Sequence, residues 1–260
     1  MAANAAAAIA RLGGNVSLWA RIGDDPSGAI ILQQLKTEGV GTAHVRSCVG
    51  VSSATAAVIV DRKGERLVVS EDDHDFPLAA DWLPIAEIKK AGAVSSDLTW
   101  LEGTIAAFGA ARAHSVPTVL DIDLNSGQLL SKVLGLADYA IFSAPAFRQF
   151  VKGESDEERL SKLVQSGVRH AGVTLGANGY LWMVHDGELH RQAAFPVEVV
   201  DTTGAGDAFH GAFAWALSQG LKDPECARIA SAVAAMSCRG LGARAGLPAR
   251  NEVEQFLEAL

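Results

Sequence analysis

The stretch Val199-Val200-Asp201-Thr202-Thr203-Gly204-Ala205-Gly206-Asp207-Ala208-Phe209 decides the fold class, because it joins an expected strand to an expected helix. The β-branched residues at its start, together with Val197, predict a strand. Apolar residues at helical spacing predict a helix over 207–219, which Gly220 would end. A turn of small residues at a helix start favours anion binding, because the first N–H groups are free and the helix dipole attracts negative charge.

Asp207 follows two glycines in this turn and is the candidate catalytic residue. Gly204 and Gly206 lack a Cβ, so the backbone there can approach a ligand closely. A carboxylate inside an anion-binding turn is unfavourable unless it contacts the group with which the anion reacts, which predicts phosphoryl transfer with Asp207 as the base. Two alternatives stay open. In the first, Asp207 serves only as a helix N-cap. In the second, the turn binds a dinucleotide through a G-x-G-x-x-G motif, although Phe209 occupies the third glycine position and such turns usually lie in the first βαβ unit.

The composition limits the class of protein. A chain of 260 residues allows one large domain, which we expect to span 1–260. The net charge of −8 and the lack of a long Lys/Arg run argue against nucleic acid or an anionic membrane as partner. The three cysteines are widely spaced, which fits the cytoplasm better than a disulfide framework. The Ala-rich start is a poor signal peptide, and no apolar run reaches the roughly 18 residues of a membrane span.

Expected strands and helices alternate over most of the chain, which indicates an α/β layered domain with a mostly parallel sheet. The expected strands are 15–20, 54–60, 66–70, 93–95, 117–122, 139–142, 172–175, 180–184 and 188–192. The expected helices are 1–12, 27–38, 103–114, 157–166, 207–219, 224–237 and 251–260. Ligands bind beyond the carboxyl ends of strands in such sheets, and Asp121, Asp123, Gly176 and Asp207 follow expected strand ends.

Four motifs in one order resemble the ribokinase-like, or PfkB, carbohydrate kinases. Residues 201–209 resemble the C-terminal signature of that family, and Thr174-Leu175-Gly176-Ala177-Asn178-Gly179 resembles its T-x-G-x-x-G nucleotide segment. Residues 21–28 resemble its G-x-D-x-x-G stretch, and 242–248 its late G-A-x-x-G-x-P loop. Within that family, the sequence most resembles the ketose-kinase-like and sulfofructose-kinase-like members. The resemblance implies a ribokinase-like three-layer α/β/α fold with a mostly parallel central sheet and a partial small β lid, whose strands we expect roughly within 44–72.

The resemblance also implies an activity and a role for each matching residue. The activity is transfer of the γ-phosphoryl group of ATP to a hydroxymethyl group of a small sugar, with Mg²⁺ and, if this member uses one, K⁺. Asp207 would take the proton from the sugar hydroxyl. The other implied roles are phosphoryl binding by the amides of Gly204, Ala205 and Gly206, ATP binding by Thr174, Gly176, Gly179 and Gly242, sugar binding by Asn4 and Thr99, a monovalent cation at Asp201 and Thr203, and Mg²⁺ at Asp123.

The chain departs from the family pattern in three places. Family members carry a strand and a lid segment before the point where this sequence begins, so we expect that strand and part of the lid to be lacking. A start codon placed too late is the favoured explanation, and the alternative is a chain that is really short, which would expose a sheet edge. Residues 143–147 replace the N-x-x-E magnesium motif, which leaves Mg²⁺ to water, phosphates and other carboxylates. Thr99 is neutral where a sulfonate-binding member needs Arg or Lys, which argues against a sulfosugar.

Two other functions stay open at this point. A nucleoside kinase of the same fold would carry the same motifs. A non-catalytic remnant would bind nucleotide through the C-terminal half without turnover. A homodimer is compatible with the resemblance, but the sequence does not decide the oligomeric state.

Overall fold

The computed structural model describes residues 1–60, 66–70, 75–124 and 130–259. The strands are β1 Ser17–Gly23, β2 Gly41–Cys48, β3 Ala56–Val60, β4 Arg66–Ser70, β5 Val94–Ser96, β6 Thr118–Ile122, β7 Tyr139–Ser143, β8 His170–Thr174, β9 Tyr180–Val184 and β10 Leu189–Gln192. The α-helices are α1 Ala2–Arg11, α2 Pro26–Thr37, α3 Leu101–Ala113, α4 Leu130–Val133, α5 Ala144–Phe150, α6 Asp156–Gln165, α7 Ala205–Ser218, α8 Asp223–Ser237 and α9 Arg250–Glu258. Short 3₁₀ helices are η1 Ile85–Lys90, η3 Leu134–Leu136 and η4 Gly176–Asn178.

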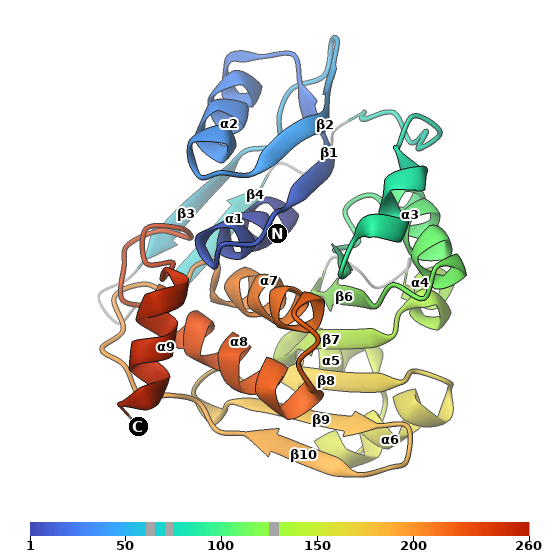
Figure 1. Ribbon diagram of the computed structural model, residues 1–260, viewed down its shortest axis with the longest axis vertical. Helices are drawn as coiled ribbons and strands as arrows, with labels where there is room; N and C mark the ends of the chain where they lie inside the picture. The colour runs from blue at the N-terminus through green and yellow to red at the C-terminus, as the bar shows by residue number, and fades with distance from the viewer. Residues whose placement is uncertain (61–65, 71–74, 125–129, 260) are drawn as a thin grey trace.

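A central sheet of six strands, in the order β10-β9-β8-β7-β6-β5, forms the middle layer (Figure 1). Strands β5 to β8 are parallel, whereas β9 pairs antiparallel with β8 and β10 antiparallel with β9. Two smaller sheets have two strands each, β1 with β2 in parallel and β3 with β4 antiparallel. Within the described ranges, no helix combines the length and the apolar character that a membrane crossing needs.

Side chains on alternate residues of the central strands face two different helix layers, as the period of two in a strand requires. In β7, Tyr139 and Ile141 pack in a cluster with α1, α7 and α8. Ala140 and Phe142 pack on the other face, in a cluster with α3, α5 and α6. The result is a three-layer α/β/α arrangement, as predicted (Figure 1). Helix α7 packs against β5 and β6.

Helix α1 packs on both sides through alanines. Ala7 and Ala8 belong to the core cluster that includes α7 and α8. Ala6 belongs to a separate cluster formed with β1, α2 and the residue before β2. The approach of α1 to α7 is close, because a Cβ on Gly211 would lie 2.4 Å from the carbonyl oxygen of Ala5. Small residues on both helices are therefore required for this contact.

The motif at 21–28 has a structural explanation, because Asp25 caps α2. Its Oδ1 accepts from the N–H of Gly28 at 2.7 Å, and its Oδ2 accepts from the N–H of Ser53 at 2.8 Å. Hydrogen bonds from Ser53 lower the pKa of Asp25. A Cβ on Gly28 would lie 2.4 Å from the carbonyl oxygen of Gly23, so glycine is needed where β1 meets α2.

The strand expected at Val197–Val200 is wrong. Residues 193–200 contain no strand, and Val199 and Val200 are 50% and 48% exposed. The N–H of Val200 instead donates to the carbonyl oxygen of Cys238, just after α8, at 2.8 Å. The sequence analysis expected no strand at β2 and no helix at α5. The strands expected at 54–60 and 66–70 correspond to β3 and β4, and the residues that join them, 61–65, lie outside the described ranges.

Candidate active site

Helix α7 begins two residues earlier than predicted, and this changes the place of Asp207. Gly204 is the N-cap, with a left-handed backbone (φ 76°), and Asp207 is the third residue of the helix. The alternative that Asp207 is only an N-cap is therefore wrong. The N–H of Ala205 donates to the carbonyl oxygen of Thr202 at 3.2 Å, and Gly206 is exposed. The remaining N–H groups of the first turn have no carbonyl one turn earlier in the helix.

A chain of polar contacts reaches Asp207 from distant parts of the sequence. Asn4 Nδ2 donates to Asp207 Oδ2 at 2.7 Å. Arg244 Nε donates to Asn4 Oδ1 at 2.8 Å, and Arg244 Nη1 donates to Glu38 Oε2 at 3.1 Å. The structure thus brings Asn4 and Asp207 together, as the predicted roles need. It also adds Arg244, whose sequence position in the late loop gave no sign of this contact.

Thr99 is tied to the same region through Asp97, which the sequence analysis did not single out. Asp97 Oδ1 accepts from the N–H of Thr99 at 3.0 Å and from its hydroxyl at 2.6 Å. Asp97 Oδ2 accepts from the N–H of Ala2 at 2.9 Å. The exposed Thr99 therefore lies near the first turn of α1, which carries Asn4.

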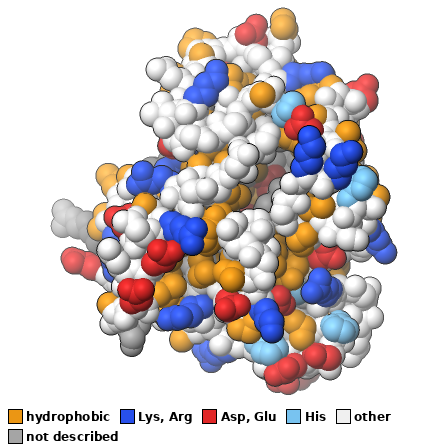
Figure 2. Space-filling model, viewed as in Figure 1, with side chains coloured by type: hydrophobic (Ala, Val, Ile, Leu, Met, Phe, Trp, Pro, Cys, Tyr) orange, Lys and Arg blue, Asp and Glu red, His pale blue; other side chains and the backbone are white. Residues whose placement is uncertain are grey.

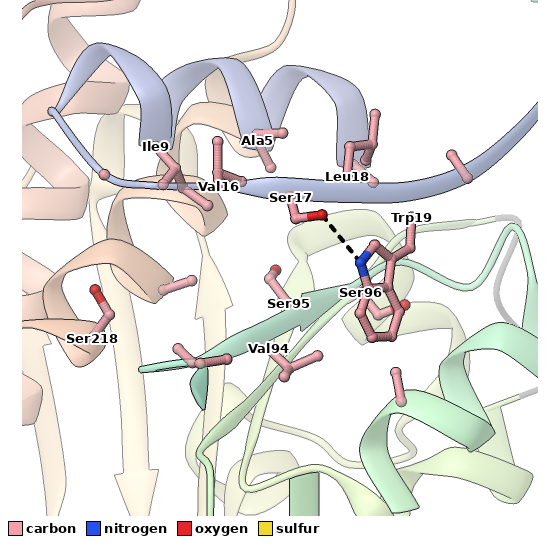
Figure 3. Close-up of a pocket in the computed structure, with 18 of the residues that line it drawn as sticks. Ala5, Ile9, Val16, Ser17, Leu18, Trp19, Val94, Ser95, Ser96 and Ser218 are labelled. Atoms are coloured by element: carbon pink, nitrogen blue, oxygen red, sulfur yellow. Dashed lines mark hydrogen bonds between the residues drawn. The ribbon is translucent and has the colours of Figure 1, made fainter. Parts of the chain in front are cut away.

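A groove of about 890 Å³ lies between β1 and β5 and reaches this region. Figure 3 shows Val16 and Leu18 on one wall and Val94 and Ser96 on the other. Asp97, Thr99, Asp121 and His210 are also among its lining residues. In the described part of the chain, β1 pairs only with β2 and β5 only with β6, so the two edges along the groove carry no further strand. Figure 2 shows a hollow between the part of the molecule that carries β1 and the part that carries β5, with hydrophobic side chains along it.

Asp121 and His210 form a buried pair beneath the first turn of α7. Asp121 follows Leu120 in β6 and therefore faces α7, where its Oδ1 lies 3.4 Å from His210 Nε2. His210 Nδ1 lies 2.8 Å from the carbonyl oxygen of Gly206. A carbonyl oxygen only accepts, so Nδ1 carries a hydrogen. His210 Nε2 also lies 3.4 Å from the carbonyl oxygen of Ile141.

Burial raises the pKa of Asp121 from 3.8 to about 6, although His210 acts in the opposite direction. The protonated carboxyl therefore binds its proton more tightly in the folded protein than in the unfolded chain. The resulting contribution to stability is fully present below about pH 3.8, the unfolded pKa, and is lost as the pH rises through the folded pKa of about 6. We expect Asp121→Asn to raise the free energy of unfolding at pH 7 by about 1–3 kcal/mol, since no buried charge forms and the new amide can donate to His210. Thermal melts of both proteins from pH 4 to pH 8 measure this. A stability difference that does not grow over that range would contradict it.

The nucleotide segment predicted at 174–179 forms the turn between β8 and β9. Thr174 ends β8, and its hydroxyl donates to the carbonyl oxygen of Phe142 at 3.3 Å. Gly176 and Gly179 have positive φ values of 57° and 86°, which glycine adopts without strain. A Cβ on Gly179 would also lie 2.1 Å from the carbonyl oxygen of Gln192. The carboxyl ends of β6, β7 and β8 share one edge of the sheet, and the first turn of α7 lies over that edge.

Asp201 and Thr203 form a buried polar cluster with the late loop. Asp201 is 2% exposed. Its Oδ1 accepts from the N–H of Thr203 at 2.9 Å, and its Oδ2 accepts from the N–H of Gly242 at 2.8 Å. Among the described residues, the buried hydroxyl of Thr203 has no hydrogen-bond partner. An unpaired oxygen beside a buried carboxylate fits a cation, because both would act as ligands.

Asp123 lies beyond β6, where it contacts the start of α5. Its Oδ1 accepts from the hydroxyl of Ser143 at 2.7 Å and from the N–H of Leu124 at 2.8 Å. Over the ranges that the structure describes, no three His, Cys, Asp or Glu side chains gather as a metal site. The role of Asp123 toward Mg²⁺ stays a prediction.

Comparison with known proteins identifies the family and the fold. The sequence profile of the pfkB family carbohydrate kinases matches residues 1–250. A ribokinase of Bacillus subtilis is 32% identical over 258 residues, which cover 98% of this chain and 86% of the relative. A fructokinase of Vibrio alginolyticus is 29% identical, with coverage of 98% of this chain and 90% of the relative.

Solved structures show the same fold. The ribokinase of Arabidopsis thaliana complexed with ribose and ATP has a TM-score of 0.88 and 26% identity, over 98% of this chain and 86% of that one. A nucleoside kinase of Burkholderia thailandensis in complex with inosine has a TM-score of 0.84 over 99% of this chain and 84% of that one, and at 22% identity it supports the fold alone. The architecture is the ribokinase fold, as predicted. The chain belongs to the pfkB family of carbohydrate kinases.

Proposed function

We propose that this protein transfers the γ-phosphoryl group of ATP to a hydroxymethyl group of a small sugar. The observation that carries the proposal is the Asp207 carboxylate in the first turn of α7, held by Asn4 at 2.7 Å, where a helix N-terminus and two glycines leave room for an anion. We also propose that residues 1–260 act as one kinase domain.

The proton transfer and the phosphoryl transfer of the proposed reaction take place at this turn. Asp207 accepts the proton of the sugar hydroxyl, the hydroxyl oxygen forms a bond to the γ-phosphorus, and the bond from that phosphorus to the oxygen of ADP breaks. The transition state is largely dissociative, so the nucleophile needs little activation and positioning does most of the work. The N–H groups of Gly204 and Gly206 would stabilise charge on the transferring group, and the N–H of Ala205 would join them by giving up its bond to the carbonyl oxygen of Thr202. Asn4 and Thr99 would hold sugar hydroxyls.

The nucleotide would lie along the carboxyl edge of the sheet, near Thr174, Gly176, Gly179 and Gly242. A relative that binds ATP supports a nucleotide site in this chain, since the ribokinase of Arabidopsis thaliana was solved with ATP and ribose. Mg²⁺ would neutralise charge on the phosphates, with Asp123 as the candidate side chain nearby. A monovalent cation such as K⁺ would be held by Asp201 and Thr203, because the unpaired hydroxyl of Thr203 lacks another partner among the described residues.

A coupled assay of ADP release tests the proposal. The protein with Mg²⁺ and ATP is offered ribose, fructose, other aldoses and ketoses, 2-keto-3-deoxy sugar acids, and purine nucleosides. We expect turnover with a sugar, and ribose and fructose come first because relatives at 32% and 29% identity carry the names ribokinase and fructokinase. Turnover confined to nucleosides would assign a nucleoside kinase. Nucleotide binding without turnover of any acceptor would indicate a non-catalytic protein. The homodimer stays a prediction that sedimentation can test.

A further inference from the structure

We propose that Arg244 is a positioning residue that fixes the side-chain amide of Asn4 so that its NH₂ group points at Asp207. The proposal rests on the proposed function, because it assigns Arg244 a part in presenting the acceptor to the base. Arg244 contacts Asn4 and Glu38 but not the Asp207 carboxylate itself in the contacts described above. It acts through Asn4.

The chemistry of the three side chains allows only one orientation of the amide. Arginine only donates hydrogen bonds, and an ionised aspartate only accepts them. Arg244 Nε lies 2.8 Å from one end of the Asn4 amide, and Asp207 Oδ2 lies 2.7 Å from the other end. The end beside Arg244 must therefore be the oxygen, and the end beside Asp207 the NH₂ group. This assignment follows from the partners, although oxygen and nitrogen of an amide have nearly the same size.

Arg244 is itself held from a different segment. Its Nη1 forms an ion pair with Glu38 Oε2 at 3.1 Å, and the two side chains are 23% and 28% exposed. A planar guanidinium presents donors in a fixed geometry, so holding one nitrogen on Glu38 restricts where Nε can point. The residue just after α2, the late loop, α1 and α7 are thereby linked in one chain, Glu38–Arg244–Asn4–Asp207.

The expected consequence concerns the acceptor more than the nucleotide. Without Arg244, the amide oxygen of Asn4 loses its donor, so the side chain is held through Asp207 alone and can swing away from its place beside the base. A sugar hydroxyl would then lose a fixed donor beside the base. We expect Arg244→Met to lower kcat/KM for the acceptor about ten- to a hundredfold, the range for loss of a hydrogen bond to a charged group. The KM for ATP should stay unchanged.

The chain offers a matched control in Arg11. This arginine also joins α1 to the late loop, because its Nε and Nη2 donate to the carbonyl oxygen of Leu247 at 3.3 and 3.1 Å. It has no contact with Asn4 in the hydrogen bonds described. Arg11→Met removes a comparable link between the same two segments, so it should not reproduce the acceptor-specific loss. An equal acceptor-specific loss in both variants would overturn the proposal in favour of general support of the loop.

A double-mutant cycle tests whether Arg244 acts through Asn4. After Asn4→Ala, the further change Arg244→Met should cost little in kcat/KM, since the group it positions is gone. Additive losses would overturn the proposal. Arg244→Lys keeps the charge but not the planar fork, and it should recover only part of the activity. If Arg244→Met unfolds, Arg244→Lys replaces it in the cycle, with the same non-additivity expected.

A readout without turnover separates this proposal from the proposed function. The side-chain NH₂ resonances of Asn4 in the NMR spectrum should shift when Asp207→Asn is introduced. The change Arg244→Met should move them toward the values of an Asn side chain that is not held in one rotamer. If no acceptor is turned over but these resonances respond as described, the proposed function fails and the positioning role stands. Resonances insensitive to Arg244→Met would overturn the positioning role.

Discussion

Replacement of Asp207 by Asn should abolish most phosphoryl transfer while leaving ATP binding intact. The carboxylate lies in the first turn of α7 and accepts from Asn4 at 2.7 Å, so it is the group in this turn that can remove a proton from an acceptor hydroxyl. Loss of a general base typically lowers kcat by about 10² to 10⁴-fold. The amide has nearly the same shape, and its oxygen can still accept from Asn4, which should preserve the fold.

Single-turnover kinetics and calorimetric titration with ATP measure the two effects separately. We expect a low kcat together with an unchanged dissociation constant for ATP. Near-normal phosphorylation by the Asp207→Asn protein would remove Asp207 from the mechanism. A parallel loss of ATP binding would instead indicate that Asp207 supports the nucleotide site and would leave the base unassigned.

Replacement of Gly204 by Ala should destabilise the protein and reduce its activity together. Gly204 has a φ of 76°, and the left-handed backbone costs an L-residue about 1–2 kcal/mol. A Cβ there would also lie 2.7 Å from the Cβ and 3.0 Å from the carbonyl oxygen of Ala243. We expect the free energy of unfolding to fall by about 1–3 kcal/mol, because relief of the contact shifts either the turn or the late loop.

Gly206 provides the matched control two residues later. Apart from its two chain neighbours and the backbone of α7, no described atom lies within 4 Å of a Cβ built on Gly206, and its φ is not positive. Gly206→Ala should therefore keep or slightly raise stability, since Ala favours a helix over Gly by roughly 0.5–1 kcal/mol. Denaturant unfolding of both variants measures the contrast. Equal loss of stability in the two variants would contradict the role given to the backbone of Gly204.

The sequence predicted those parts of the fold and the candidate site that depend on neighbouring residues. The glycine turn before Asp207 and the two glycines at 176 and 179 are local features, and each has the positive φ or the open space that its motif predicts. The alternation of strands and helices likewise predicted the layered fold. The strand at 197–200 was wrong because β-branched residues favour extended backbone but do not supply a partner strand.

Contacts between distant residues could not be predicted in this way. Arg244 and Asn4 are 240 positions apart, and they meet only because the late loop packs beside α1. His210 and Asp121 meet because the pleat of β6 turns Asp121 toward α7, which requires knowing the strand's exact limits and its helical neighbour. No sequence motif assigned a role to His210 or Arg244.

The alanines of α1 have a mechanical consequence. This short helix is shared by the core cluster around α7 and α8 and by the smaller cluster around β1 and α2. Alanine side chains let the backbones pack closely, so α1 has little room to shift relative to its neighbours. The helix should therefore move as a rigid body when either cluster is displaced. Asn4 lies on α1, so a tilt of the sheet formed by β1 and β2 would directly change the distance between Asn4 and Asp207.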